Sequence, residues 1–170
     1  MLFRSELVRR HINLVFTAAQ RRLNGDTALA EDVTQQVFID LSRNARRWAN
    51  VAVLGGWLHQ HTGFVAGKAL RAEIRRKQRE GEALTMNSST GETLLAKLGG
   101  ALDEALDELS PHERDVLLLR YFERHDLRTI GARLGLSDDA AQKRVSRALD
   151  RLRQRLAIRG HALPAATVAA

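Results

Sequence analysis

The sequence predicts an all-α protein made of two small helical domains joined by a flexible linker. The chain has 170 residues, of which 44% are hydrophobic and 28% are charged, so it can bury a core. It has two prolines and 5% aromatic residues, a composition that favours helices over a β-sandwich or barrel. A stretch without helical periodicity marks the linker, and its central residues are Asn87, Ser88, Ser89, Thr90 and Gly91.

The charge balance points to nucleic acid as a partner. The chain holds 27 Lys and Arg against 20 Asp and Glu, a formal net charge of +7. Cysteine is absent, which excludes disulfide frameworks, thiol nucleophiles and zinc bound by cysteine. The sequence shows no apolar run of membrane-spanning length and no signal segment, so we expect a soluble, cytoplasmic protein.

Apolar residues recur every three or four positions in the first part of the chain and predict two helices. The first helix ends at Asn24 and Gly25, and its apolar residues are Val8, Ile12, Val15, Ala19 and Leu23. The second begins after Asp26, a good N-cap residue, and its apolar face holds Ala30, Val33, Val37 and Leu41. A connection from Ser42 to Gly56 follows.

A third helix, from about Trp57 to Arg79, has two distinct faces. Its apolar stripe holds Leu58, Thr62, Val65, Ala69 and Ala72. A second face runs from aromatic to basic and holds Trp57, His61, Phe64, Lys68, Arg71 and Arg75. Such rings can stack on unpaired bases while the cations follow phosphates, although Trp57 and Phe64 could instead belong to the core.

Other residues of the first part have simpler interpretations. His59 and His61 point in different directions on a helix and do not form a metal site. Gly63 and Gly67 are expected to allow close packing of a neighbouring helix. The acidic residues Asp26, Glu31 and Asp32 could form a catalytic cluster, but they are more simply capping residues or a docking surface for a basic partner.

The second part opens with an acidic helix and a strong helix-start signal. The acidic residues are Asp103, Glu104, Asp107 and Glu108. Ser110 as N-cap, Pro111 and Glu113 then predict a capping box, and Val116 to Phe122 forms the apolar body of that helix.

A helix-turn-helix pattern follows. Leu127 to Leu134 is a short helix that ends at Gly135, and Ser137 begins a last helix that reaches about Leu156. Away from the buried stripe of the last helix lie polar residues suited to base edges and phosphates: Gln142, Lys143, Arg144, Arg147 and Arg151. The alternative is a three-helix bundle with a solvated basic face.

Three segments together resemble sigma factors of the extracytoplasmic function (ECF) type in the sigma-70 family. They are AEDVTQQVFIDLSRNARRW (30–48), GWLHQHTGFVAGKALRAEIRRKQRE (56–80) and LDELSPHERDVLLLRYFERHDLRTIGARLGLSDDAAQKRVSRALDRLRQRL (106–156). The resemblance implies a sigma region 2-like three-helix bundle over residues 1–80 and a linker over 81–100. It further implies a region 4-like helix-turn-helix bundle over 101–157, and we expect a disordered tail over 158–170.

The same resemblance implies three binding surfaces. The clamp helices of the beta-prime subunit of the RNA polymerase core would bind Glu31, Asp32, Gln35, Gln36 and Phe38. The −10 promoter element, melted to single strand, would contact Trp48, Asn50, Trp57, His61, Phe64, Lys68, Arg71 and Arg75, with a flipped base in the loop 49–55. The −35 element would be read in the duplex by Gln142, Lys143, Arg144, Arg147 and Arg151.

Two departures from the family pattern refine these expectations. Many members carry Asn where Phe64 stands. A Thr-Val pair is common where Ala140 and Ala141 stand, which moves the expected base contacts to Gln142, Lys143 and Arg147.

The function that follows is that of an alternative sigma factor. It would bind core polymerase, recognise promoter DNA and promote melting, with no cofactor and no bond chemistry of its own. An anti-sigma protein is a further candidate partner. The alternatives are a helix-turn-helix regulator that binds duplex DNA without polymerase, and a small helical hydrolase or metal enzyme, which would need an acid–base constellation that the sequence does not show.

Overall fold

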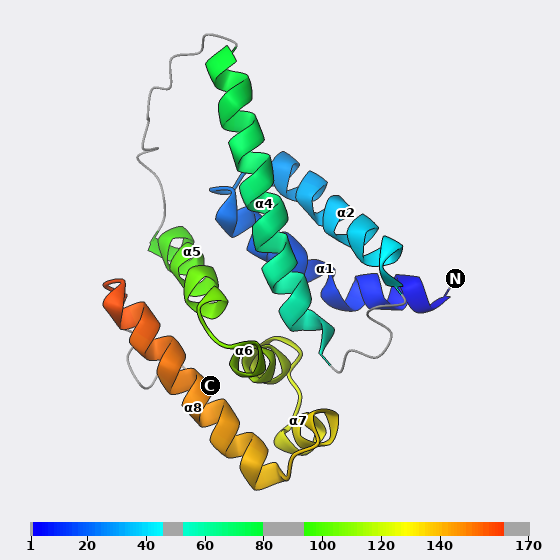
Figure 1. The fold of residues 1–170 in the computed structure, drawn as a ribbon, viewed down its shortest axis with the longest axis vertical. Coiled ribbons are helices and arrows are strands. Elements are labelled where there is room, and N and C mark those ends of the chain that lie inside the picture. Colours follow the sequence, from blue (N-terminus) through cyan, green and yellow to red (C-terminus); the bar gives the residue numbers. More distant parts are fainter. Residues whose placement is uncertain (1, 46–52, 80–93, 162–170) are drawn as a thin grey trace. The chain divides into compact units, whose positions relative to one another are not determined.

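The computed structural model describes residues 2–45, 53–79 and 94–161, and the regular elements in these ranges are all helices (Figure 1). The chain divides into two compact units, Met1–Ala49 with Trp57–Lys97 and Asn50–Gly56 with Leu98–Ala170. These observations confirm the predicted all-α, two-domain class. The predicted site residues Trp48 and Asn50 lie outside the described residues, as do most of the predicted linker and tail.

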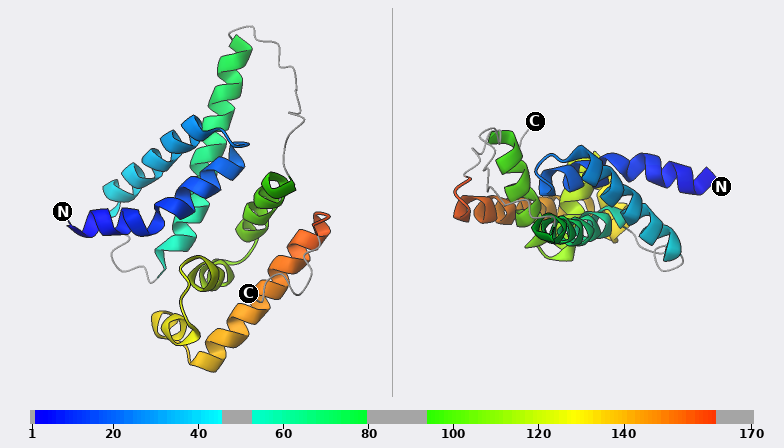
Figure 2. Two further views of the ribbon diagram at one scale, coloured as in Figure 1. Left: turned by 180° about the vertical axis from the view of Figure 1, so that it is seen from behind. Right: turned by 90° about the horizontal axis from the view of Figure 1, so that it is seen from above.

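The first unit is built from three long helices. They are α1 (Leu2–Arg22), α2 (Thr27–Arg43) and α4 (Leu54–Arg79), and α4 crosses the α1–α2 pair in both ribbon views (Figures 1 and 2). Asn24 and Gly25 turn the chain between α1 and α2 with φ angles of 54° and 83°. Asp26 then caps α2 as predicted, because its carboxylate accepts a hydrogen bond of 3.0 Å from the Leu29 amide.

The buried faces of α1 and α4 differ in part from the predicted stripes. Ile12 is 41% exposed, and the buried side of α1 is carried by residues further along the helix. On α4, Leu58 and Thr62 are buried as expected, whereas Ala72 is exposed and Ala66 is buried. The core residues of this unit include Leu14, Val15, Ala18, Ala19, Leu23, Ala30, Val33, Val37, Leu41, Leu58 and Ala66.

The second unit is a bundle of shorter helices around a long C-terminal helix. Its elements are α5 (Leu94–Asp107), α6 (Pro111–Leu117), a π-helix η1 (Leu118–Phe122), α7 (Leu127–Leu134) and α8 (Asp138–Ile158). Helices α6 and α7 both pack against α8. The core they share includes Ala105, Leu106, Leu109, Val116, Leu117, Leu119, Ile130, Ala141, Val145, Ala148, Leu152 and Leu156.

Two predicted boundaries differ in the structure, because the glycine pairs 55–56 and 99–100 lie inside helices. The connection predicted to end at Gly56 ends earlier, because α4 begins at Leu54. Likewise α5 begins at Leu94, so residues 94–100 are helical rather than part of the linker. A helical glycine costs about 1 kcal/mol relative to alanine, which the surrounding apolar residues can offset.

The capping box at the start of α6 is present, but the helix does not continue as predicted. The Glu113 carboxylate accepts hydrogen bonds from the Ser110 amide at 3.1 Å and from its hydroxyl at 2.7 Å. After Leu117 the backbone widens to π geometry, and the Glu123 amide donates to the Leu118 carbonyl at 2.9 Å. Leu118 and Leu119 are both buried in this segment.

Arg114 holds the end of α5. Its side chain is buried, and its guanidinium donates to the carbonyls of Leu106 at 2.9 Å, Asp107 at 3.1 Å and Leu109 at 3.0 Å. These carbonyls belong to the last turn of α5 and the residues after it, where helical partners are missing. Arg114 therefore fixes α5 to the start of α6.

The turn of the helix-turn-helix depends on two glycines. Gly135 caps α7 in the left-handed conformation, with a φ of 66°, as the sequence indicates. The Leu136 amide donates to the Gly131 carbonyl at 2.8 Å, and a Cβ added at Gly131 would lie 2.7 Å from the Leu136 carbonyl oxygen. Gly131 thus permits the close backbone approach that sets α8 against α7.

Gly63 and Gly67 do not pack against a neighbouring helix in the same way. A Cβ at Gly63 would meet the guanidinium of Arg22 at 2.5 Å, so this glycine leaves room for a side chain of α1. Among the residues that the structure describes, a Cβ at Gly67 would meet Arg71 of its own helix, at 3.5 Å. The expectation of close helix packing is therefore wrong at Gly67.

Candidate nucleic-acid interface

Three rings lie in sequence along α4 and form what we call the aromatic column: Trp57, His61 and Phe64. The Trp57 and His61 ring centroids are 4.6 Å apart with an interplanar angle of 13°, and those of His61 and Phe64 are 6.2 Å apart at 24°. Phe64 is 65% exposed, so it does not belong to the core. The column therefore presents an accessible aromatic surface on which a planar base could stack.

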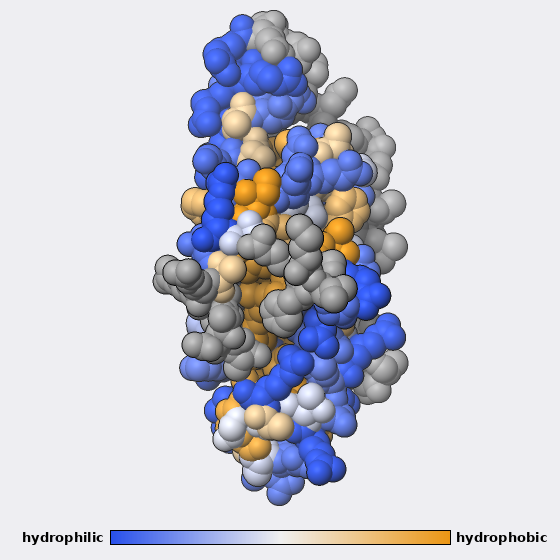
Figure 3. All heavy atoms as spheres, turned by 90° about the vertical axis from the view of Figure 1, so that its right-hand side faces the viewer, coloured by the Kyte–Doolittle hydropathy of each residue, from blue (hydrophilic) through white to orange (hydrophobic). Residues whose placement is uncertain are grey.

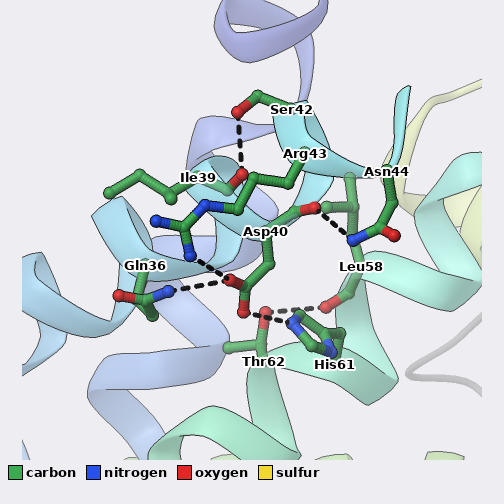
Figure 4. A network of polar contacts seen from close by, with 9 residues as sticks. All are labelled: Gln36, Ile39, Asp40, Ser42, Arg43, Asn44, Leu58, His61 and Thr62. Atoms are coloured by element: carbon green, nitrogen blue, oxygen red, sulfur yellow. Dashed lines mark hydrogen bonds and ion pairs between the residues drawn. The ribbon is translucent and has the colours of Figure 1, made fainter. Parts of the chain in front are cut away.

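A polar network on α2 holds the middle ring of the column (Figure 4). The Oδ2 atom of Asp40 lies 3.0 Å from His61 Nε2, and its Oδ1 atom accepts from Gln36 Nε2 at 2.8 Å. Arg43 is 4.0 Å from the same carboxylate. The hydrogen bond from His61 holds the pKa of Asp40 below its usual value, although burial opposes this effect.

The C-terminal half of α4 is basic and exposed. Lys68, Arg71 and Arg75 continue the face of the aromatic column and are all exposed, as predicted. The end of α4, at the top of Figure 3, is covered by hydrophilic side chains. Part of the positive charge is compensated within the helix, because Glu73 pairs with Arg76 at 2.6 Å and lies 3.9 Å from Lys77.

Helices α1 and α2 line an open groove of about 660 Å³. Three of the predicted core-binding residues, Glu31, Gln35 and Phe38, lie along it, and Asp32 is exposed on the same helix. Gln36 is turned toward Asp40 instead. The sequence did not indicate the contribution of α1 to this groove, which comes from Val8, Ile12, Asn13 and Phe16.

The N-terminal half of α8 carries the predicted recognition residues. The Ser137 hydroxyl caps α8 by accepting from the Ala140 amide at 3.2 Å. Gln142, Lys143 and Arg147 are exposed and line one shallow pocket of about 380 Å³, while Arg144 is half-buried. These side chains form a polar, cationic surface at the start of the second helix of the helix-turn-helix.

The C-terminal half of α8 uses its arginines differently. Arg151 and Arg155 of α8 and Arg159 at its C-cap, spaced four residues apart, form ion pairs with Glu104 of α5, Glu113 of α6 and Glu108 between these two helices. The pairs are Arg151 with Glu113 at 2.6 Å, Arg155 with Glu108 at 3.5 Å, and Arg159 with Glu104 at 3.2 Å and with Glu108 at 2.6 Å. The predicted DNA-binding residue Arg151 is therefore already engaged within the unit, although its side chain is 64% exposed.

The two histidines of α4 are separated as predicted. His59 is fully buried, whereas His61 faces Asp40. Among the residues that the structure describes, no group of three or more metal-ligating side chains comes together. None of the described helices combines the length and apolarity needed to cross a membrane.

Comparisons with known proteins agree with this arrangement. Residues 7–80 match the family model for sigma-70 region 2, and residues 105–154 match that for sigma-70 region 4. The RNA polymerase sigma factor CarQ of Myxococcus xanthus is 30% identical over 142 residues, which cover 79% of each chain. The chain therefore belongs to the sigma-70 family, and within it to the ECF group of sigma factors.

Two further proteins match this chain, but the first is longer than this chain and the second has a structure of low similarity to it. The ECF RNA polymerase sigma factor SigE of Mycolicibacterium smegmatis is 32% identical over 158 residues, which are 89% of this chain but only 61% of that protein. The solved structure of the sigma factor RpoE from Bartonella quintana, in complex with the anti-sigma factor NepR, is 20% identical. It matches with a TM-score of 0.39 over 92% of this chain and 97% of that chain.

Proposed function

We propose that this protein is an alternative sigma factor that binds the RNA polymerase core, recognises the −10 and −35 promoter elements and promotes DNA melting. Its role in initiation is to bind and position rather than to catalyse. The unit with α1, α2 and α4 would bind the core and the −10 element, and the unit with α5 to α8 would bind the −35 element. The observation that carries the proposal is the exposed aromatic column beside a cationic helix end.

The aromatic column favours single-stranded over duplex DNA. In a duplex the faces of the bases are covered by their neighbours, so an exposed ring such as Phe64 has no base to stack on. A melted strand offers those faces, and Lys68, Arg71 and Arg75 would follow its phosphates. A helix-turn-helix regulator that acts on duplex DNA alone has no use for this surface. We extend the same role to Trp48 and Asn50 on the family resemblance.

The α8 surface favours the duplex. A helix that follows a tight turn and presents Gln142 and Lys143 near its start can reach base edges in the major groove. Arg144 is the next residue and Arg147 lies one turn further on, and these two would contact phosphates. Arg151 would contribute a phosphate contact only by leaving Glu113.

The groove between α1 and α2 favours docking of the polymerase core. It combines apolar walls with the acidic residue Glu31 at its edge, and Asp32 adds a second exposed carboxylate. A basic amphipathic helix would match both properties. Core binding would use Glu31, Asp32, Gln35 and Phe38, and we extend the same role to Gln36 on the family resemblance.

The aromatic column can be tested with holoenzyme assembled from the full chain and bacterial core polymerase. Two probes are needed, a short duplex and the same duplex with a single-stranded extension. The single-stranded extension should add binding free energy relative to the duplex alone. Trp57→Ala and Phe64→Ala should each reduce this added free energy by about 1–3 kcal/mol per stacked base. Tyr121→Ala, which removes an aromatic ring that is 43% exposed in the other unit, is the matched control. If both column variants behave like Tyr121→Ala, the column has no role in DNA binding.

Core docking has a separate test. Asp32→Arg reverses an exposed charge on α2 and should abolish co-purification with core polymerase, because a basic partner would then be repelled. Glu6→Arg makes the same reversal on α1 and should leave co-purification intact. Retention of the core by Asp32→Arg would reject this surface.

A further inference from the structure

The contact between Asp40 and His61 joins α2 to the middle of the aromatic column. The two residues are 21 positions apart in sequence, and the Oδ2–Nε2 distance is 3.0 Å. Only 27% of the Asp40 side chain and 22% of the His61 side chain are exposed. The pair is therefore shielded from water, unlike a surface ion pair whose side chains exchange partners freely.

The carboxylate restricts the orientation of the His61 ring. The low pKa of Asp40, caused by the His61 hydrogen bond, keeps it ionised at neutral pH, so it can only accept hydrogen bonds. The proton of a neutral His61 must then be on Nε2, and this nitrogen must point toward α2. Without such a partner, rotation about the bond to an imidazole ring is only weakly restricted.

The ring orientation matters because His61 lies between the other two rings. Its plane is nearly parallel to that of Trp57, at 13°, and close to that of Phe64, at 24°. A rotated imidazole would lose both stacking contacts. The Gln36 amide, at 2.8 Å from Oδ1, in turn holds the carboxylate in place (Figure 4).

We propose that Asp40 is a positioning residue for single-strand binding, which acts through His61 Nε2 to hold the aromatic column in its stacked arrangement. The inference rests on the proposed function of α4. Side chains that are ordered before binding lose less freedom on binding, which increases affinity for an unstacked base. The proposal predicts weaker DNA binding when the Asp40 carboxylate is removed, which is the opposite of what simple electrostatics predicts. A carboxylate beside a DNA-binding face repels phosphates, so its removal would strengthen binding if charge were its only effect.

The test uses holoenzyme and the two probes described above. Asp40→Ala should reduce the affinity gained from the single-stranded extension about tenfold, the effect of losing roughly 1.4 kcal/mol. Duplex affinity and core co-purification should remain unchanged. Asp40→Asn, whose amide oxygen can still accept from Nε2, should recover most of the loss. Glu6→Ala, which removes an exposed acid paired with Arg9, is the matched control.

A double-mutant comparison separates positioning from a general structural effect. If Asp40 acts through His61, His61→Ala should produce a similar loss, and Asp40→Ala should add nothing to it. Losses that add would overturn the proposal, as would unchanged or tighter binding by Asp40→Ala. If Asp40→Ala does not fold, the comparison of Asp40→Asn with His61→Ala decides: equal losses would show that hydrogen-bond acceptance does not suffice and would reject the proposal.

A spectroscopic measurement distinguishes failure of this inference from failure of the proposed function. Proton NMR of the His61 imidazole in the full chain reports the ring current of Trp57 without any DNA. Asp40→Ala should move the His61 signals toward those of an unstacked histidine, and unchanged signals would refute the positioning role. If neither Trp57→Ala nor Phe64→Ala loses single-strand affinity, the proposed role of the aromatic column in DNA binding fails, whatever this measurement shows.

Discussion

Gly131 allows a sharp test of how the helix-turn-helix is held. Alanine at this position would place its Cβ 2.7 Å from the Leu136 carbonyl oxygen, closer than the 3.0 Å that real Cβ atoms respect. The obstacle is backbone, and the Leu136 amide also donates to Gly131, so the two segments cannot separate without straining that bond. Overpacking of this kind costs about 1–3 kcal/mol, whereas alanine improves helix propensity by about 1 kcal/mol.

The expected net effect of Gly131→Ala is a loss of up to about 2 kcal/mol of stability in the second unit. Urea unfolding followed by far-UV circular dichroism measures this loss, and hydrogen exchange of α7 and α8 amides localises it. The matched control is Gly67→Ala in α4, where the added Cβ has Arg71 at 3.5 Å as its nearest described neighbour and should stabilise by up to about 1 kcal/mol. A Gly131→Ala variant as stable as Gly67→Ala would refute the close approach at the turn.

Three further perturbations test other parts of the structure. Arg114→Met should destabilise the second unit by about 3 kcal/mol in urea unfolding because buried carbonyls lose their donor. The control Arg120→Met, which removes the exposed hydrogen bond from Arg120 to the His125 carbonyl, should cost about 1 kcal/mol or less. Equal effects would contradict the capping role. Burial raises the pKa of Glu113, but the hydrogen bonds from Ser110 and the Arg151 charge together outweigh it and hold this pKa below its usual 4.5. Ionised Glu113 therefore stabilises the folded state fully above the pKa that it has in the unfolded chain. This contribution is lost as the pH falls through its lower pKa in the folded state, so Glu113→Gln should remove this part of the acid unfolding curve. Arg147→Ala should lower the salt dependence of −35 duplex binding by about 0.9 in the log–log slope, while Arg155→Ala should leave it unchanged; equal slopes would argue against a phosphate contact at Arg147.

The sequence correctly predicted the helix ends that depend on interactions between residues close together in the chain. Asp26, Ser110 and Gly135 act within one helical turn of their own positions, so their residue types and spacing were enough to place helix ends. The three- and four-residue steps likewise placed Trp57, His61 and Phe64 on one face, where the structure has them.

Interactions between distant residues could not be predicted in this way. Arg114 acts as a cap for α5 only because α6 folds back onto it, and a count of charges does not show that Arg151 faces Glu113. The bond between Asp40 and His61 likewise depends on how α2 and α4 cross. The π-helix after Leu117 was missed because its residues are apolar in either geometry.

Transcription with purified components measures the central claim most directly. The full chain is added to bacterial core RNA polymerase on fragments of genomic DNA, and the transcripts are mapped. Initiation from a limited set of positions that depends on the chain, and that is lost with Asp32→Arg, is the predicted result. A chain that binds DNA but neither associates with core polymerase nor changes where it initiates would contradict the account.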